Sequence, residues 1–236
     1  MIARAFSIAG GVLFASSIAC FIWFYLFGLD RRQGGRDILA ALTINVALFS
    51  IFALHHSVFA RPQLRAWMAR TVSPRLERSM YVWAASVSFG AVCLLWQPAG
   101  APLWDADGAA RLLLRALQLG GIAFTLWAAQ ALDGLALAGV RQLDAPLPAS
   151  GIETSSATLQ HTGPYGIVRH PIYLGWLLIV WPAPTMTPSH LMFAAVSTAY
   201  LVLATIYEER GLHQTFGPAY AEYARKVPKK MVPGIY

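Results

Sequence analysis

An uncharged apolar stretch at residues 5–29 constrains the fold of this chain more than any other feature of its sequence. A helix needs about 20 mostly apolar residues to cross the hydrocarbon core of a bilayer. Comparable stretches follow at about residues 38–59, 80–96, 112–138 and 172–207. Only 12% of the 236 residues are charged, against about 25% in an average soluble domain. The sequence therefore predicts an all-α integral membrane protein and excludes a soluble or disordered chain.

The first and last apolar stretches have distinct interpretations. A cleaved signal peptide has a short apolar core, whereas residues 5–29 run on past Cys20, so we expect an uncleaved first span. Residues 172–207 are too long for one span, and they contain Pro182, Pro184 and Pro188, which break a helix. We therefore expect four transmembrane helices followed by a proline-broken helical hairpin, which is either re-entrant or made of two linked spans.

With four spans before the hairpin, the lysines and arginines divide unevenly between the two sides of the membrane. Thirteen fall on the side of the N-terminus and five on the other side. Cytoplasmic loops carry the excess of Lys and Arg, so we predict that the N-terminus and the C-terminal tail are cytoplasmic. The formal net charge of +7 then reflects orientation in a membrane rather than binding to nucleic acid. We treat residues 1–236 as one domain, with residues 1–138 forming the four-helix membrane part. Residues 139–236 form a polar loop, the hairpin and a short helical tail.

The segment at the start of the hairpin is the strongest candidate for chemistry. Residues 163–175 read GPYGIVRHPIYLG, in which Gly163-Pro164 forces a turn and Pro171 begins a helix. The free amides of that helix start suit an anionic carboxylate. Gly175 leaves room for another backbone or for a flat ligand. An interfacial anchor is the alternative interpretation.

Two adjacent carboxylates, Glu208 and Glu209, lie at the predicted end of the returning helix. The helix dipole disfavours anions at a C-terminus, so a cationic ligand would offset their cost. A solvated stop signal is the alternative.

Ionisable groups in two further spans are functional candidates because they are costly at membrane depth. His55 and His56 end the second span, and Asp133 lies in the predicted fourth span. Each can instead be an interfacial group without a ligand. We predict no metal site, because no other His or Cys stands at ligand spacing from the histidine pair. Cys20 and Cys93 form no disulfide or metal motif.

Residues 158–233 resemble the superfamily of membrane methyltransferases that includes isoprenylcysteine carboxyl methyltransferases and phospholipid N-methyltransferases. The resemblance rests on elements that occur in the same order: GPY at 163–165, RHPIYLG at 169–175, Glu208-Glu209, FGPAY at 216–220, Tyr223 and Val227-Pro228.

Further elements, three in the N-terminal half and two beyond it, are similar to bacterial methanethiol S-methyltransferases, which implies a bacterial inner membrane. They are HSVFARP at 56–62, ERSMYV at 77–82, WQP at 96–98, GVRQ at 139–142 and PTMT at 184–187. The sequence departs from this pattern between about residues 143 and 161, a segment that could border the substrate entrance. The departure leaves the identity of the substrate open.

The resemblance implies that S-adenosylmethionine binds at the cytosolic membrane face without a Rossmann fold, and the chain has no GxGxxG between a strand and a helix. The glutamates suit the ammonium or the ribose of this donor, the helix start at His170 suits its carboxylate, and the tyrosines can stack or hydrogen-bond. The implied cofactor-binding residues are Leu159, Gln160, Tyr165, His170, Pro171, Ile172, Tyr173, Glu208 and Glu209.

The resemblance further implies methyl transfer to a small thiol such as methanethiol, with His56 and Arg210 as candidate assisting residues. Besides membrane lipids, the expected partner is this thiol or a lipidic acceptor, either an isoprenylcysteine carboxylate or a phospholipid amine. Two alternatives of another class stay open. One is a haem- or quinone-binding protein that uses His55, His56 and His170, and the other is a small transporter that uses Asp133.

Overall fold

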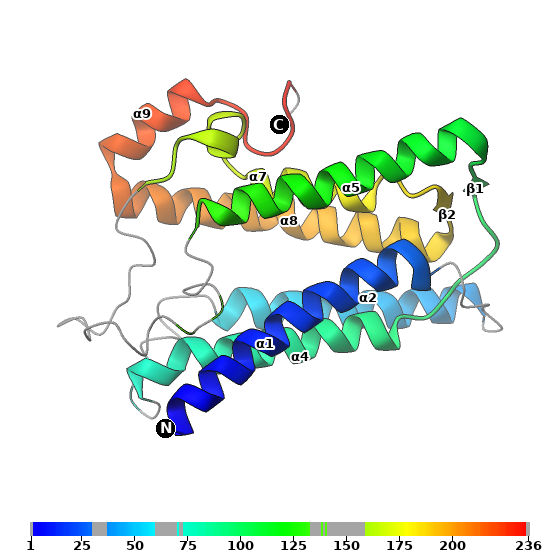
Figure 1. Ribbon diagram of the computed structural model, residues 1–236, viewed down its shortest axis with the longest axis horizontal. Coiled ribbons are helices and arrows are strands. Elements are labelled where there is room, and N and C mark those ends of the chain that lie inside the picture. Colours follow the sequence, from blue (N-terminus) through cyan, green and yellow to red (C-terminus); the bar gives the residue numbers. More distant parts are fainter. Residues whose placement is uncertain are drawn as a thin grey trace. The chain divides into compact units, whose positions relative to one another are not determined.

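The computed structural model describes residues 2–29, 37–59, 70, 73–132, 138, 140 and 159–234. The chain divides into two compact units. Unit 1 comprises Met1–Pro98 with Asp133–Ser155, and unit 2 comprises Ala99–Leu132 with Ser156–Tyr236. The regular structure of the described residues is helical except for one two-stranded sheet, which confirms the predicted all-α class (Figure 1).

Unit 1 contains three long apolar helices. Helix α1 (Ile2–Trp23) continues through a π-helical turn (Phe24–Gly28), and α2 (Ile38–Phe59) has the bounds predicted for the second span. Helix α4 (Pro74–Leu95) begins before the predicted third span, with a proline in its first turn. Buried aromatic residues such as Phe21 and Phe89 pack between these helices.

Buried polar contacts connect the helices of unit 1. The Ser7 and Ser79 hydroxyls lie 2.7 Å apart between α1 and α4. The Asn45 amide of α2 bonds both backbone groups of Gln97, donating to its carbonyl at 2.8 Å and accepting from its N–H at 2.7 Å. These bonds satisfy polar groups that would otherwise be costly in an apolar interior.

Unit 2 contains the proline-broken hairpin and the helices packed against it. Its elements are β1 (Trp104–Asp105), α5 (Gly108–Gln130), α7 (Pro171–Val180), β2 (Thr185–Met186), α8 (Pro188–Phe216) and α9 (Pro218–Lys226). Strand β1 pairs antiparallel with β2, and Trp104 lies opposite Met186. The hairpin is α7 and α8 (Figure 1). Pro182 and Pro184 lie in the segment between them and Pro188 is the first residue of α8, which confirms the predicted break.

Five helices in the described residues are long and apolar enough to cross a membrane: α1 with its π-turn, α2, α4, α5 and α8. The protein is therefore an integral membrane protein, with apolar faces available to lipid. Helix α7 has 10 residues, so its length of about 15 Å covers only half of the hydrocarbon core.

The predicted end of the fourth span is wrong. Helix α5 ends at Gln130 rather than near residue 138, and the Leu132 N–H closes a tight turn onto the Ala129 carbonyl at 3.1 Å. Asp133 follows and is succeeded by Gly134, and both residue types favour the end of a helix. Asp133 itself lies outside the described residues.

Helices α5 and α7 approach each other closely at two glycines. A Cβ atom on Gly121 would lie 2.9 Å from the Gly175 carbonyl oxygen, and one on Gly175 would lie 3.0 Å from the Gly121 carbonyl oxygen. Small residues allow such backbone contact between membrane helices. Gly175 therefore makes room for another backbone, which is one of the two roles expected from the sequence.

Candidate functional site

The residues before α7 form a tight turn that presents two charged side chains to the rest of unit 2. Gly163–Gly166 is a single turn of 3₁₀ helix, and α7 starts with Pro171 as its first residue. Arg169 and His170 lie between these two elements, and both are buried. The predicted turn and helix start are confirmed.

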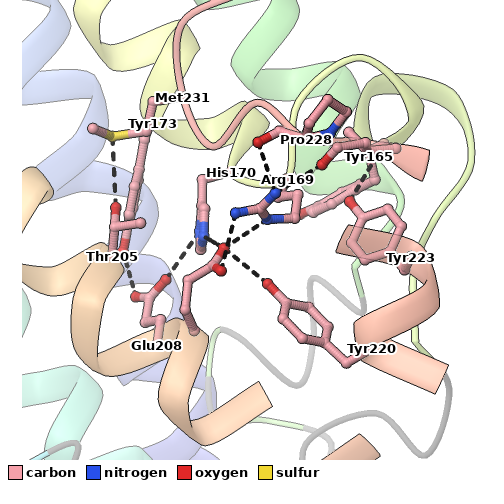
Figure 2. A network of polar contacts seen from close by, with 12 residues as sticks. Tyr165, Arg169, His170, Tyr173, Thr205, Glu208, Tyr220, Tyr223, Pro228 and Met231 are labelled. Atoms are coloured by element: carbon pink, nitrogen blue, oxygen red, sulfur yellow. Dashed lines mark hydrogen bonds and ion pairs between the residues drawn. The ribbon is translucent and has the colours of Figure 1, made fainter. Parts of the chain in front are cut away.

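Glu209 of α8 is the centre of a polar network at this end of unit 2. Figure 2 shows Arg169, His170 and Tyr220, which point toward one another in this network. The Arg169 guanidinium donates to both carboxylate oxygens of Glu209, from Nε at 2.8 Å and from Nη2 at 3.0 Å. The His170 Nε2 atom lies 3.0 Å from Oε1, and the Tyr220 hydroxyl donates to the same oxygen at 2.8 Å. Such charge-assisted bidentate pairing fixes both partners in position.

Glu208, the preceding residue, is more accessible. Its side chain is 49% exposed, against 14% for Glu209. It accepts a hydrogen bond from the Tyr173 hydroxyl, and the His170 Nδ1 atom lies 3.3 Å from its Oε2. The His170 ring thus lies between two carboxylates and stacks on Tyr173.

The two carboxylates control the protonation of His170. Burial by itself lowers the pKa of this imidazole, but the hydrogen bonds and negative charges of Glu208 and Glu209 outweigh it and raise the pKa above 6.5. The protonated ring donates from both nitrogens, so the imidazolium form matches the two acceptors.

Helix α9 folds back onto the site because of Gly217. This residue has φ 52° and ψ −124°, a conformation that glycine tolerates best, and Pro218 then starts α9. The reversal directs Tyr220 to Glu209 and lets the Tyr223 hydroxyl donate to the Tyr165 carbonyl at 2.7 Å. Burial raises the pKa of Tyr223 to about 12, so its hydroxyl stays a donor.

The chain after α9 returns to the start of α7. The N–H groups of Arg169 and His170 donate to the carbonyls of Lys229 and Lys230 at 3.0 and 2.8 Å. The Arg169 Nη1 atom donates to the carbonyls of Val227 and Pro228 at 2.8 and 2.9 Å. The main-chain carbonyls of the four successive residues 227–230 therefore all accept hydrogen bonds from Arg169 or His170.

These bonds correct the expectation of free amides at the helix start. The His170 N–H is occupied by a tail carbonyl, Pro171 has no N–H, and the Tyr173 N–H bonds the His170 carbonyl at 3.1 Å. Little of the helix terminus is left to bind a carboxylate.

The expected end of the returning helix near Glu208 and Glu209 is also wrong. Helix α8 continues to Phe216, so Glu208 and Glu209 lie about two turns before its C-terminus, where the dipole effect has decayed. Their negative charge is offset by Arg169 and His170 instead. The exposed Arg210 guanidinium lies 5.7 Å from the centre of the Tyr207 ring.

The remaining predicted residues lie in two places. In unit 2, Leu159 packs against a cluster of Tyr220, Tyr223 and Val227, Gln160 and Ile172 are half-buried, and Pro171 is buried. In unit 1, His56 forms its own pair, its Nδ1 atom lying 2.9 Å from the Tyr81 hydroxyl. In the parts of the chain that the structure describes, no group of three His, Cys, Asp or Glu side chains is placed to hold a metal ion.

Three residues central to the network were not predicted as site residues: Arg169, Tyr220 and Tyr223. Arg169 directly precedes the predicted His170. An arginine at a membrane boundary is only weak evidence of a site residue, because arginines commonly place their charged groups at such a boundary. The two tyrosines are three residues apart, which places them on one face of a short helix. Two tyrosine hydroxyls on one helix face, close in sequence to the Glu208-Glu209 pair, could have suggested a hydrogen bond between a tyrosine and a glutamate.

Comparison with known proteins places the chain among bacterial enzymes. It is 37% identical over 196 residues to methanethiol S-methyltransferase 2 of Bradyrhizobium diazoefficiens, covering 83% of this chain and 74% of the relative. It is 36% identical over 203 residues to methanethiol S-methyltransferase of Crocosphaera subtropica, covering 85% and 78%. Rat nurim is a more distant relative, 28% identical over 78% of this chain and 75% of its own length. No family model matches the chain, and no solved structure matches it.

Proposed function

Because the chain belongs to the family of membrane methyltransferases that includes the methanethiol S-methyltransferases, we propose that it transfers a methyl group from S-adenosylmethionine to a small thiol. Methanethiol is the acceptor named for these relatives, and its methylation gives dimethyl sulfide. The observation that supports the proposal most directly is the pair of adjacent carboxylates, Glu208 and Glu209, set among histidine and tyrosine side chains at one end of unit 2.

The acceptor capacity of the two glutamates fits a cationic donor. A carboxylate has about four acceptor positions. Within the described residues, Glu209 Oε2 receives one hydrogen bond, from Arg169, and each oxygen of the half-exposed Glu208 has one polar partner. The vacant positions suit the ammonium or the ribose hydroxyls of S-adenosylmethionine.

The aromatic rings around the glutamates provide flat surfaces for the rest of the donor. The His170 and Tyr173 rings are stacked with centroids 5.4 Å apart. Tyr165, which precedes them in the sequence, is half-buried. We propose that donor binding uses the residues that the family resemblance implies: Leu159, Gln160, Tyr165, His170, Pro171, Ile172, Tyr173, Glu208 and Glu209.

S-adenosylmethionine supplies an activated methyl group on a sulfonium. The carbon–sulfur bond of the sulfonium breaks as the acceptor sulfur forms its new bond, which leaves S-adenosylhomocysteine. The thiol must first lose its proton, since the thiolate is the nucleophile. We propose that His56 accepts this proton and that the exposed Arg210 attracts the anion. Charge is dispersed during the transfer, so orientation and exclusion of water supply most of the acceleration.

Cations in unit 2 support a cytosolic donor site. Arg169, Arg210 and the basic residues of the tail lie at the end of unit 2 that contains the site, whereas Arg111 and Arg115 lie in the first two turns of α5. The excess of cations marks the cytoplasmic side of a membrane protein. We propose that the N-terminus and the site face the cytosol, where S-adenosylmethionine is available.

A substrate panel tests the proposal. Purified protein in lipid nanodiscs receives S-adenosylmethionine labelled on its methyl group together with methanethiol, sulfide, farnesylcysteine or phosphatidylethanolamine. We expect labelled dimethyl sulfide from methanethiol. Label in farnesylcysteine or phosphatidylethanolamine alone would instead assign a lipidic acceptor, and absence of haem absorbance in the sample counts against the haem-binding alternative.

Binding of S-adenosylhomocysteine by calorimetry tests the donor site. Glu208→Gln and Glu209→Gln should each weaken binding by at least about tenfold, because each loses a charged acceptor. Glu222→Gln is the matched control, since Glu222 is an exposed glutamate of α9 paired only with Lys226 in the described contacts. Unchanged binding by both site variants refutes the assignment.

A further inference from the structure

Arg169 has no role in the proposed chemistry, yet its side chain is the most completely bonded charged group of the site. Four of the five guanidinium N–H donors have an acceptor: two are the carboxylate oxygens of Glu209, and two are the carbonyls of Val227 and Pro228. The residue is 9% exposed. A buried arginine with this bonding is fixed in one orientation.

The four carbonyls of residues 227–230 belong to a short segment that we call the strap, residues 227–231. Two contacts anchor it. Tyr223, just before the strap, bonds the Tyr165 carbonyl, and Met231 at its end is 2% exposed, with its sulfur 3.6 Å from the Thr205 hydroxyl of α8. The strap therefore touches the turn before α7 and the body of α8 (Figure 2).

The strap and Glu209 make contact only through Arg169 in the described hydrogen bonds. The chain separation is large: Arg169 is 40 residues from Glu209 and 58 residues from Val227. Arg169 thus joins three segments, and removing its fork would leave Glu209 with the bonds from His170 and Tyr220, both on Oε1. The Oε2 atom, which has acceptor positions left over, is oriented by Arg169 alone.

We propose that Arg169, held by the main-chain carbonyls of the strap, is a positioning residue that orients Glu209 and His170 for donor binding. The inference rests on the proposed function, because it assigns Arg169 and the strap a role in binding S-adenosylmethionine. Arg169 itself does not touch the donor. It acts by fixing the acceptor atoms that do.

This role predicts a defined kinetic signature. Lysine in place of Arg169 keeps the charge but provides a point donor that cannot serve two carboxylate oxygens and two carbonyls at once. In Arg169→Lys, the KM for S-adenosylmethionine should rise by about tenfold or more. The KM for the thiol and the kcat at saturating donor should stay within about threefold of the wild type.

Lys226→Ala is the matched control for charge at this end of the chain. Lys226 ends α9, its side chain is 72% exposed, and it pairs with Glu222 rather than with the strap. We expect wild-type donor KM in this variant. A donor KM in Arg169→Lys within twofold of the wild type, or an equal rise in the KM for both substrates, overturns the positioning role.

Hydrogen exchange of the wild-type protein tests the same role without any variant. The N–H groups of Arg169 and His170 bond carbonyls of the strap directly. The rate of hydrogen exchange at these two amides therefore reports how firmly the strap is held against the turn before α7. Because coupling between ligand and strap is reciprocal, saturation with S-adenosylhomocysteine should slow exchange at these two amides. A wild-type protein that does not bind S-adenosylhomocysteine refutes the proposed function. A protein that binds it with unchanged exchange at these amides refutes only the inference about Arg169.

Discussion

Replacing Gly175 by alanine should push α7 away from α5. The new Cβ would overlap the Thr125 hydroxyl oxygen and lie 3.1 Å from the Thr125 Cβ and 3.0 Å from the Gly121 carbonyl oxygen. Ordinary van der Waals contacts between heavy atoms begin at about 3.5 Å. A threonine rotamer change cannot relieve the contact with the carbonyl, because that atom belongs to the backbone.

The magnitude follows from these contacts. Overpacking of a close interface costs about 1–3 kcal/mol, and separating α5 from α7 by even about 0.5–1 Å forfeits a quarter to a half of each dispersion contact across it. Alanine has a higher helix propensity than glycine by about 1 kcal/mol, which offsets part of the cost. We expect Gly175→Ala to lower the stability of unit 2 by about 1–2 kcal/mol.

Thermal unfolding of the purified protein in one detergent measures this change, with the KM for S-adenosylmethionine as a second readout. Gly120→Ala is the matched control, because a Cβ on Gly120 of α5 meets nothing within 4 Å. Thr125→Ala should partly rescue Gly175→Ala, since it removes the overlapping hydroxyl, with a coupling energy of about 1 kcal/mol.

The donor KM should rise with Gly175→Ala because α7 carries His170 at its start and Tyr173 in its first turn. The reasoning is refuted if Gly175→Ala unfolds at the same temperature as Gly120→Ala. It is equally refuted if Thr125→Ala gives no rescue.

Three further perturbations have expected outcomes. Tyr220→Phe removes one hydrogen-bond donor to Glu209. The loss of about 1 kcal/mol should raise the dissociation constant of S-adenosylhomocysteine about fivefold, as measured by calorimetry. An unchanged dissociation constant contradicts the role of Tyr220. Because the pKa of His170 is raised above 6.5 in the folded protein, its stabilising effect is full below pH 6.5 and is lost as pH rises through the raised pKa. The difference in unfolding temperature between wild type and His170→Asn should therefore shrink with rising pH, and a difference that grows would contradict the assigned charge. Gln118→Ala deprives the Ile179 carbonyl of the donor that bonds it at 2.9 Å and should destabilise unit 2 by about 1–3 kcal/mol, seen as a lower unfolding temperature than in Gly120→Ala.

The helices that depend on local patterns could be predicted from the sequence. Helix α2 has the predicted bounds because residues 38–59 form one uninterrupted apolar stretch. The break after α7 followed from Pro182, Pro184 and Pro188, and the start of α7 followed from Pro171. In each case a few neighbouring residues decide the backbone geometry.

Features that depend on distant partners could not be predicted in this way. The end of α8 was placed too early because the apolar stretch of residues 172–207 ends just before Glu208 and Glu209. Their charge is compensated by His170 and Arg169, which are about 40 residues away in the sequence. The free amides expected before α7 are occupied by carbonyls about 60 residues further along. No local pattern indicates either pairing.

The length of α8 sets the depth at which the proposed donor site would lie in a bilayer. From Pro188 to Glu208 the helix rises about 30 Å, which equals the thickness of the hydrocarbon core. If α8 enters the hydrocarbon core at Pro188, the two carboxylates reach the opposite boundary between acyl chains and headgroups, where the proposed water-soluble donor and membrane-permeant acceptor would meet. Longer acyl chains would draw this boundary past the glutamates, at a cost of fractions of a kcal/mol per Å of mismatch. On this proposal, we expect the thickness of the surrounding membrane to change donor binding without altering any residue.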